Sequence, residues 1–172
     1  MTKALLVIDV QEGIFKLPAS LHNAENFLVR IESLITKARI SGTNIVYFQH
    51  CGAKGTPIEK GAENWQIHRS ITPQPGEHVI EKSTANVFYQ TDLDDYLKKN
   101  GIQELCICGF STPMCIDTTI KVASDRGYKC TLVGNAHTTT ATPILSAEQI
   151  INHHNFFLKN FAAVIPEEEI DF

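Results

Sequence analysis

Short apolar runs rich in β-branched residues alternate with segments of helical periodicity along this chain of 172 residues. The apolar runs cover residues 4–8, 44–48, 78–81, 104–108, 129–133 and 162–165. The helical segments cover residues 24–39, 92–99, 113–126 and 147–160. Apolar strands that alternate with helices pair in parallel and are covered on both faces. The pattern therefore predicts an α/β fold: a three-layer, doubly wound, mostly parallel sheet of about six strands with helices on both faces, forming a single domain over residues 1–172.

Residues that commonly begin and end helices support these segments. Ser146 with Gln149, and Thr91 with Asp94, have the spacing of a capping box, and Pro113 is a favoured first helical residue. Glycines follow the first three segments, where they commonly end helices: Gly42, Gly101 and Gly127.

Charge and hydropathy exclude several classes of protein. The net charge of -4 gives no reason to expect nucleic acid or an anionic membrane as a partner. No apolar run approaches the roughly 20 residues that span a bilayer, and the short run at the start ends in Asp9, so we expect a first strand and a cytoplasmic protein. The five cysteines show no CxxC spacing, and in a cytosolic protein we expect most of them to be reduced.

Three chemically versatile residues follow apolar runs, at the edge where open parallel sheets bind ligands. Asp9 ends LLVID, Lys82 ends HVIEK, and Cys115 lies just beyond the fourth run, in the first turn of the helix predicted to begin at Pro113. A thiolate, an ammonium that stabilises it and a carboxylate that moves protons together form an acyl-transfer site. The helix start and Lys82 lower the pKa of such a thiol, whereas burial and Asp9 raise it. We expect the first two to prevail, and Cys115 to react with iodoacetamide faster than the other cysteines.

Each of these residues, taken alone, also fits a structural role as a cap, a surface lysine or a packed core cysteine. A non-catalytic binding protein therefore remains an alternative on spacing alone. A flavodoxin-like nucleotide binder is disfavoured, because DVQEGIF after the first run has no glycine-rich phosphate loop.

Four longer stretches carry a family resemblance: ALLVIDVQ (4–11), VIEKSTANVF (79–88), CGFSTPMCIDTTIKVASDRGY (108–128) and GNAHTT (134–139). They resemble the isochorismatase-like cysteine hydrolases, which include nicotinamidases, carbamoylsarcosine amidases and streptothricin hydrolases. The resemblance implies Asp9, Lys82 and Cys115 as the catalytic residues and a cis peptide at Phe110–Ser111. It also implies an oxyanion hole made by the backbone N–H groups of Ser111 and Cys115.

The same resemblance implies the reaction and the assembly. It implies hydrolysis of a C–N bond in a small amide, carbamoyl or lactam substrate through a thioester, in a homodimer or homotetramer. Isochorismatases proper cleave a vinyl ether and lack the cysteine, so Cys115 favours amide chemistry. Asn135 stands where the family often has aspartate, which puts the role of that position in doubt.

Nicotinamidases bind a metal through an Asp-x-His pair and a further histidine, and the corresponding FQHCGAKG (48–55) lacks the aspartate. We therefore expect neither a metal nor a cofactor. A metal-dependent, nicotinamidase-type amidase remains the alternative, with His50, His68 and Cys51 as its conceivable ligands.

The substrate pocket is the least determined part of the site. Residues 50–77 have no clear periodicity, and irregular segments of that length are usually functional. Five residues near the catalytic positions or in this segment are candidate substrate contacts: Gln11, Phe15, Trp65, Asn86 and Phe88. For each of them, ordinary packing in the core or between subunits is an equally good interpretation.

Overall fold

A parallel sheet with the strand order β3-β2-β1-β4-β5-β6 forms the centre of the computed structural model, which describes residues 2–172. The strands are β1 (Thr2–Ile8), β2 (Asn44–His50), β3 (His78–Lys82), β4 (Ile102–Phe110), β5 (Lys129–Thr138) and β6 (Ala163–Ile165). The α-helices are α1 (Ala24–Ser41), α2 (Leu93–Lys99), α3 (Asp117–Asp125) and α4 (Ala147–Phe157). The predicted α/β fold with a mostly parallel sheet is therefore confirmed.

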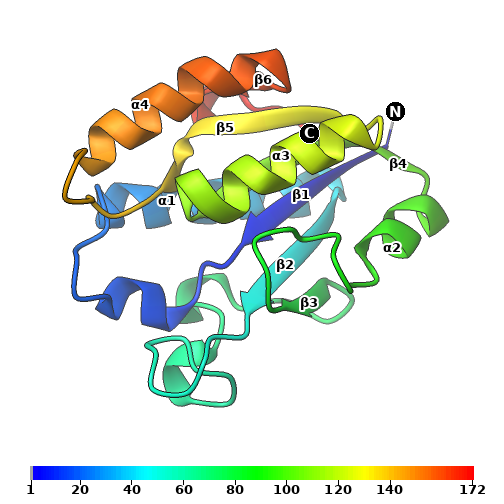
Figure 1. The fold of residues 1–172 in the computed structure, drawn as a ribbon. Coiled ribbons are helices and arrows are strands. Elements are labelled where there is room, and N and C mark those ends of the chain that lie inside the picture. Colours follow the sequence, from blue (N-terminus) through cyan, green and yellow to red (C-terminus); the bar gives the residue numbers. More distant parts are fainter. Residues whose placement is uncertain (1) are drawn as a thin grey trace.

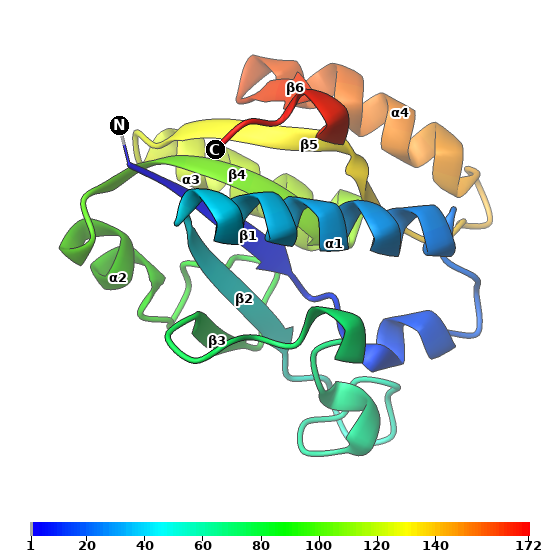
Figure 2. The ribbon, with the colours of Figure 1, turned by 180° about the vertical axis from the view of Figure 1, so that it is seen from behind.

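Helices cover both faces of the sheet, as Figures 1 and 2 show from opposite sides. Side chains alternate along each strand, so Leu5 and Val7 of β1 pack with α1, whereas Leu6 and Ile8 pack with α2 and α3 on the other face. Both sets are almost completely buried, which explains why the strands read as continuous apolar runs.

Two helix starts differ from their predictions. The capping box of Ser146 and Gln149 is present, but α2 begins at Leu93, with Asp92 as its N-cap. Thr91 donates its hydroxyl to the Val87 carbonyl at 2.6 Å and accepts from the Leu93 N–H only at 3.5 Å. The segment predicted as one helix from Pro113 begins as a π-helical turn, Thr112–Ile116, and continues as α3. Cys115 therefore lies in a wider turn that precedes the regular helix.

The chain reverses its direction across the sheet between β1 and β4. From β1 it proceeds to β2 and β3, and from β4 it proceeds to β5 and β6 on the other side. Such a switch point opens a crevice at the carboxyl ends of the two central strands, which are followed by Asp9 and by the turn that contains Cys115. Gly109 at the end of β4 allows the two strands to approach, because a Cβ there would lie 2.1 Å from the Ile8 carbonyl oxygen.

Residues 51–77 form no strand or long helix. They contain two short 3-10 turns, Glu63–Trp65 and Arg69–Ile71, and Ile67 pairs with Gln11 in an isolated bridge. This segment therefore lies beside the carboxyl end of β1 (Figure 2). In the part of the chain that the structure describes, no helix has both the length and the apolar character needed to cross a bilayer.

Candidate active site

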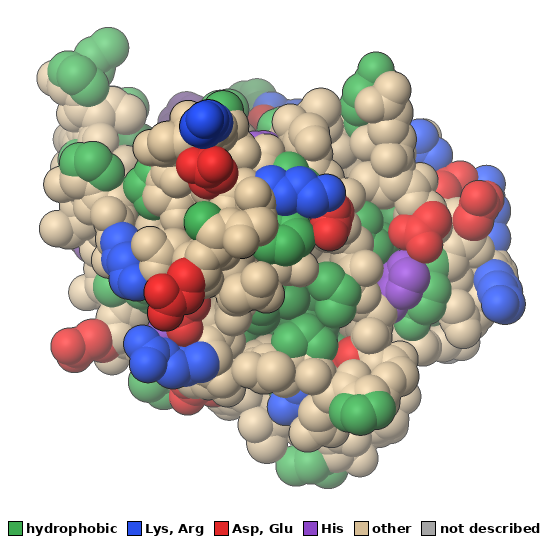
Figure 3. Space-filling model, turned by 90° about the horizontal axis from the view of Figure 1, so that it is seen from below, with side chains coloured by type: hydrophobic (Ala, Val, Ile, Leu, Met, Phe, Trp, Pro, Cys, Tyr) green, Lys and Arg blue, Asp and Glu red, His purple; other side chains and the backbone are tan. Residues whose placement is uncertain are grey.

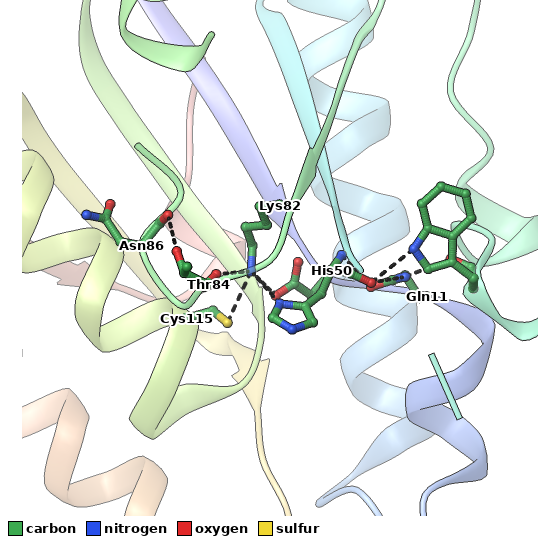
Figure 4. Close-up of polar contacts among 8 residues, drawn as sticks. Gln11, His50, Lys82, Thr84, Asn86 and Cys115 are labelled. Carbon is green, nitrogen blue, oxygen red and sulfur yellow. Dashed lines mark hydrogen bonds and ion pairs between the residues drawn. The ribbon is translucent and has the colours of Figure 1, made fainter. Parts of the chain in front are cut away.

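The Lys82 ammonium is the centre of a buried polar cluster (Figure 4). Its Nζ lies 2.7 Å from Asp9 Oδ2, 3.3 Å from Cys115 Sγ, 3.2 Å from His50 Nδ1 and 3.1 Å from the Thr84 carbonyl oxygen. The three residues that the sequence places at strand ends therefore converge, which was the geometric expectation. The Lys82 side chain has no exposed surface, so its interaction with Asp9 is a buried ion pair.

One carboxylate oxygen of Asp9 is hydrogen-bonded within the described chain, and the other is not. Its backbone has a left-handed conformation, φ 54°, which aspartate tolerates better than most residues and which turns the chain at the end of β1. Oδ2 accepts from Lys82, whereas Oδ1 is buried and has no hydrogen-bond partner within the described chain. A buried carboxylate oxygen without a partner is costly, and it is a ready acceptor for a proton delivered at the site.

The environment of Cys115 favours the thiol over the thiolate. Burial, together with the Asp9 carboxylate, raises the pKa of Cys115 to about 12, and the opposing effect of Lys82 is smaller. The expectation that the charges of Lys82 and the helix start prevail is therefore wrong, because the side chain is deeper than a strand-end position indicates and a carboxylate lies beside it.

His50 is a member of the cluster that the sequence interpretation considered only as a metal ligand. It ends β2 at the same edge as Asp9 and Lys82, and this shared position was the available signal. The ammonium donates to Nδ1, so the neutral ring carries its proton on Nε2. Burial and the Lys82 charge lower the pKa of His50, which keeps the ring neutral.

His50, His68 and Cys51, the conceivable metal ligands, do not form the shared site that the metal-dependent alternative requires. His68 lies beside Ser70 and Glu12, and Cys51 lies beside Glu81. Among the described residues, the group with suitable spacing is Asp9, His50 and Cys115, whose ligand atoms lie within 4.8 Å of one another. The Lys82 ammonium contacts all three side chains, so a metal ion there would meet a positive charge already in place.

The backbone next to Cys115 has the form that the family resemblance implies. The Phe110–Ser111 peptide bond is cis, and the turn that follows returns the N–H groups of Met114 and Ile116 to the Ser111 carbonyl. The Ser111 hydroxyl lies 3.2 Å from that of Thr139. Ser111 and Cys115 thus belong to one tightly folded turn at the end of β4.

Gln11 and Trp65 brace the site from behind. The Gln11 amide donates to the carbonyls of His50 and Trp65 and accepts from the His50 N–H, and the side chain is completely buried. The Trp65 indole donates to the same His50 carbonyl at 3.0 Å. Figure 4 shows the Gln11 side chain on the far side of His50 from Cys115. Gln11 and Trp65 both hold the end of β2, which agrees with the alternative interpretation of ordinary packing, and substrate contact by either residue stays a prediction.

The side chains of the other three candidate substrate contacts make their polar and aromatic contacts with residues other than Asp9, His50, Lys82 and Cys115. The Phe15 ring packs against His68, and the Phe88 ring packs between Tyr128 and the Arg126 guanidinium. Asn86 accepts from the Phe88 N–H, and its amide points away from Lys82 in Figure 4. These are the contacts of packing residues, so substrate binding by this group stays a prediction that the geometry does not favour.

Asn135 makes side-chain hydrogen bonds to the C-terminal segment. Its amide accepts from the Glu167 N–H and donates to the Glu168 carboxylate, which ties β5 to the C-terminal segment. The departure from the family pattern at this position therefore leaves the Lys82 cluster unchanged.

Acidic and basic side chains are interspersed over the face seen in Figure 3, without the single-sign field that attracts polyanions.

Comparison with known proteins gives a consistent result. The family model described as Isochorismatase domain matches residues 3–168. Streptothricin hydrolase of Streptomyces noursei is 33% identical over 141 residues, 82% of this chain but 51% of that protein, so the chain spans about half the length of this relative. The uncharacterized isochorismatase family protein YddQ of Bacillus subtilis is 36% identical over 147 residues, 84% of this chain and 82% of YddQ. The crystal structure of an isochorismatase from Pseudomonas putida KT2440 superimposes with a TM-score of 0.92 at 32% identity, covering 98% of this chain and 89% of that one.

Proposed function

The chain belongs to the isochorismatase family, and we propose that it is a cysteine hydrolase that cleaves a C–N bond of a small amide, carbamoyl or lactam substrate. The observation that carries this proposal is the contact of one ammonium with both a carboxylate and a thiol inside the switch-point crevice. A nucleophile, a base and a fixed positive charge within hydrogen-bond distance are what acyl transfer requires.

The first half of the reaction begins with a neutral thiol. Asp9 takes the Cys115 proton as Sγ attacks the carbonyl carbon, and Oδ1 is the free oxygen that can accept it. The C–N bond then breaks, Asp9 returns the proton to the leaving nitrogen, and a thioester remains on Cys115. Lys82 stabilises the negative charge wherever it lies, on Asp9 or on sulfur.

The second half returns the enzyme to its starting state. Asp9 takes a proton from water, and the water oxygen attacks the thioester carbonyl. The C–S bond then breaks, and Asp9 gives its proton to the departing sulfur, which leaves an acid product and the Cys115 thiol. In both halves we propose that the N–H groups of Ser111 and Cys115 bind the oxyanion. The Nε2–H of neutral His50 is a further donor at the site.

We propose that this chemistry needs no metal, because the Lys82 ammonium already supplies a positive charge in contact with Asp9, His50 and Cys115. Turnover should survive dialysis against EDTA unchanged. Loss of turnover with recovery on adding zinc or manganese would favour the nicotinamidase-type alternative.

We also propose a homodimer or homotetramer. Large apolar side chains are exposed on α4 and on the loop before it, where a second copy would cover them: Ile144, Leu145, Phe156 and Phe157. Sedimentation velocity at micromolar concentration should give a mass at least twice that of one chain, and a monomer would contradict this part of the proposal.

A panel of streptothricin, N-carbamoylsarcosine and nicotinamide tests the function directly. We expect wild-type protein to hydrolyse at least one class, and mass spectrometry of acid-quenched reactions to find the acyl group on the peptide that contains Cys115. Cys115→Ala should remove both signals. Turnover that survives Cys115→Ala would reject the mechanism. A chain that neither turns over the panel nor acylates Cys115 with p-nitrophenyl acetate would be the non-catalytic binding protein.

A further inference from the structure

A second buried polar cluster adjoins the turn of Ser111 and Cys115, and the proposed chemistry does not use it. The His137 ring near the end of β5 contacts Thr112 on one side and Asn155 of α4 on the other. Nδ1 lies 2.9 Å from Thr112 Oγ1, and Nε2 lies 2.9 Å from Asn155 Oδ1. His137 and Thr112 are both buried, so these bonds do not compete with solvent.

The donor and the acceptor of each hydrogen bond in this cluster can be assigned by starting from Asn155, at the end far from Thr112. Asn155 donates its amide N–H to the Gly134 carbonyl at 2.8 Å, which leaves Oδ1 as an acceptor facing His137. Nε2 must therefore carry the ring proton, and Nδ1 must accept. The Thr112 hydroxyl is then a donor, fixed in one orientation. Burial lowers the pKa of His137 to about 4, so the ring remains neutral in this arrangement.

Thr112 is the first residue of the π-helical turn that contains Cys115, and it follows Ser111 directly. Ser111 is attached to the same end of β5, through Thr139. Residues 137 and 139 lie on the same side of the chain in an extended segment. The side chains of Ser111 and Thr112, which are adjacent in the sequence, are therefore both held at the carboxyl end of β5. The two proposed oxyanion donors therefore depend on contacts with β5 for their position.

We propose that His137 is a positioning residue, which through the Thr112 hydroxyl holds the turn of Ser111 and Cys115 in the geometry that stabilises the oxyanion. This inference rests on the proposed function and adds a residue that acts on the reaction through another. Small displacements of groups that stabilise a transition state reduce rate far more than they reduce binding.

Two reagents that differ in mechanism test it. Acylation of Cys115 by p-nitrophenyl acetate passes through an oxyanion, whereas alkylation by iodoacetamide is a displacement at a saturated carbon and forms none. Thr112→Val removes the hydroxyl and keeps the shape. We expect it to slow acylation about tenfold or more, while alkylation changes less than about twofold and KM for a panel substrate stays constant.

Matched variants separate positioning from general damage. Thr119 is also buried, and its hydroxyl has no hydrogen-bond partner within the described chain, so Thr119→Val should leave both rates at the wild-type value. Thr112→Ser, which restores the hydroxyl, should recover most of the lost acylation rate. His137→Leu should resemble Thr112→Val, and the double variant should be no slower than either single one, because both remove the same bond.

The outcomes distinguish this inference from the function on which it rests. Equal slowing of both reagents in Thr112→Val, or no slowing of either, would show that the cluster has only a structural role. Acylation at the wild-type rate in Cys115→Ala would instead contradict the proposed nucleophile. If His137→Leu fails to fold, the comparison of Thr112→Val with Thr112→Ser and Thr119→Val still decides.

Discussion

The two buried polar clusters at the carboxyl edge of the sheet differ in charge and in hydrogen-bond saturation. Around Lys82 an ammonium, a carboxylate and a thiol are packed together, and one oxygen of Asp9 has no partner. Around His137 every group is neutral, and each donor faces an acceptor up to the Gly134 carbonyl. The turn Thr112–Ile116 joins the two clusters, because it contains both Thr112 and Cys115.

The difference shows how this fold divides two tasks. A saturated neutral network is rigid, because any rearrangement leaves a buried polar group without a partner. An unsaturated charged cluster is poised to gain a proton, since the cost of its free oxygen is relieved when one arrives. Under the proposed function, the saturated cluster would hold the turn of Cys115 in place and leave the free oxygen of Asp9 available as a proton acceptor.

The largest expected effect concerns the free oxygen. Asp9→Asn keeps the shape of the side chain and removes the base, so Cys115 acylation and substrate turnover should fall by about 10²–10⁴. Asp92→Asn, at the exposed N-cap of α2, is the matched control and should change neither rate. An Asp9→Asn variant with more than a tenth of wild-type turnover would show that another group removes the thiol proton.

The ion pair of Asp9 and Lys82 should stabilise the fold only when both charged side chains are present. Lys82→Met and Asp9→Asn each leave a buried charge uncompensated, and each should lower the free energy of unfolding by about 3–5 kcal/mol. The double variant should lose less than the sum of the two, as urea unfolding would measure. Strict additivity would mean that the two charges do not interact as the 2.7 Å contact indicates.

Much of the charged cluster could be predicted from the sequence because strand ends in a parallel sheet share one edge. Asp9, Lys82 and Cys115 each follow an apolar run, and that position alone was enough to bring them together. His50 follows the same rule and was missed as a cluster member, because its residue type directed attention to metals. The pKa of Cys115 was mispredicted because the depth of burial depends on the turn that follows β4, which the sequence does not show.

The neutral cluster could not be predicted in the same way. The apolar run of β5 ends at residue 133, yet the strand continues to Thr138 and carries His137 with it. The partner Asn155 belongs to α4, and its approach depends on how that helix packs against the sheet. Gly109 was also missed, since only the paired strands reveal that Ile8 leaves no room for a side chain.

Acid should weaken the neutral cluster. The pKa of His137 is lowered from 6.5 to about 4 in the folded chain, so below pH 6.5 the unfolded chain binds more protons than the folded one. The stability that this residue contributes is complete above pH 6.5 and is lost as the pH falls to 4, by up to about 3 kcal/mol. His50, whose pKa is also lowered, adds to the same slope.

Urea unfolding at several pH values between 7 and 4 would measure this effect. His137→Asn keeps an acceptor for Thr112 and removes the titrating ring, so its unfolding free energy should fall less steeply with acid than that of wild type. Equal slopes in the two proteins would show that the pKa of His137 is not lowered in the folded chain, and the neutral ring on which the assigned hydrogen-bond directions depend would then be wrong.

The smallest expected effect comes from a hydroxyl that belongs to neither cluster. Asp9 Oδ1 and Thr119 Oγ1 are the two buried side-chain atoms without a hydrogen-bond partner in the described part of the chain. The proposed function gives a use to the free Asp9 oxygen but none to the Thr119 oxygen. The unpaired Thr119 hydroxyl should therefore only lower the stability of the fold, and its removal should leave activity unchanged. Valine has the same shape and nearly the same helix propensity as threonine, so Thr119→Val should raise the free energy of unfolding by about 1 kcal/mol. Urea unfolding measures the change, and p-nitrophenyl acetate acylation should remain at the wild-type rate. A loss of stability would mean that the Thr119 hydroxyl does have a hydrogen-bond partner, such as a buried water. The Asp9 oxygen could then have the same kind of partner, and its lack of a protein partner would no longer point to a role in chemistry.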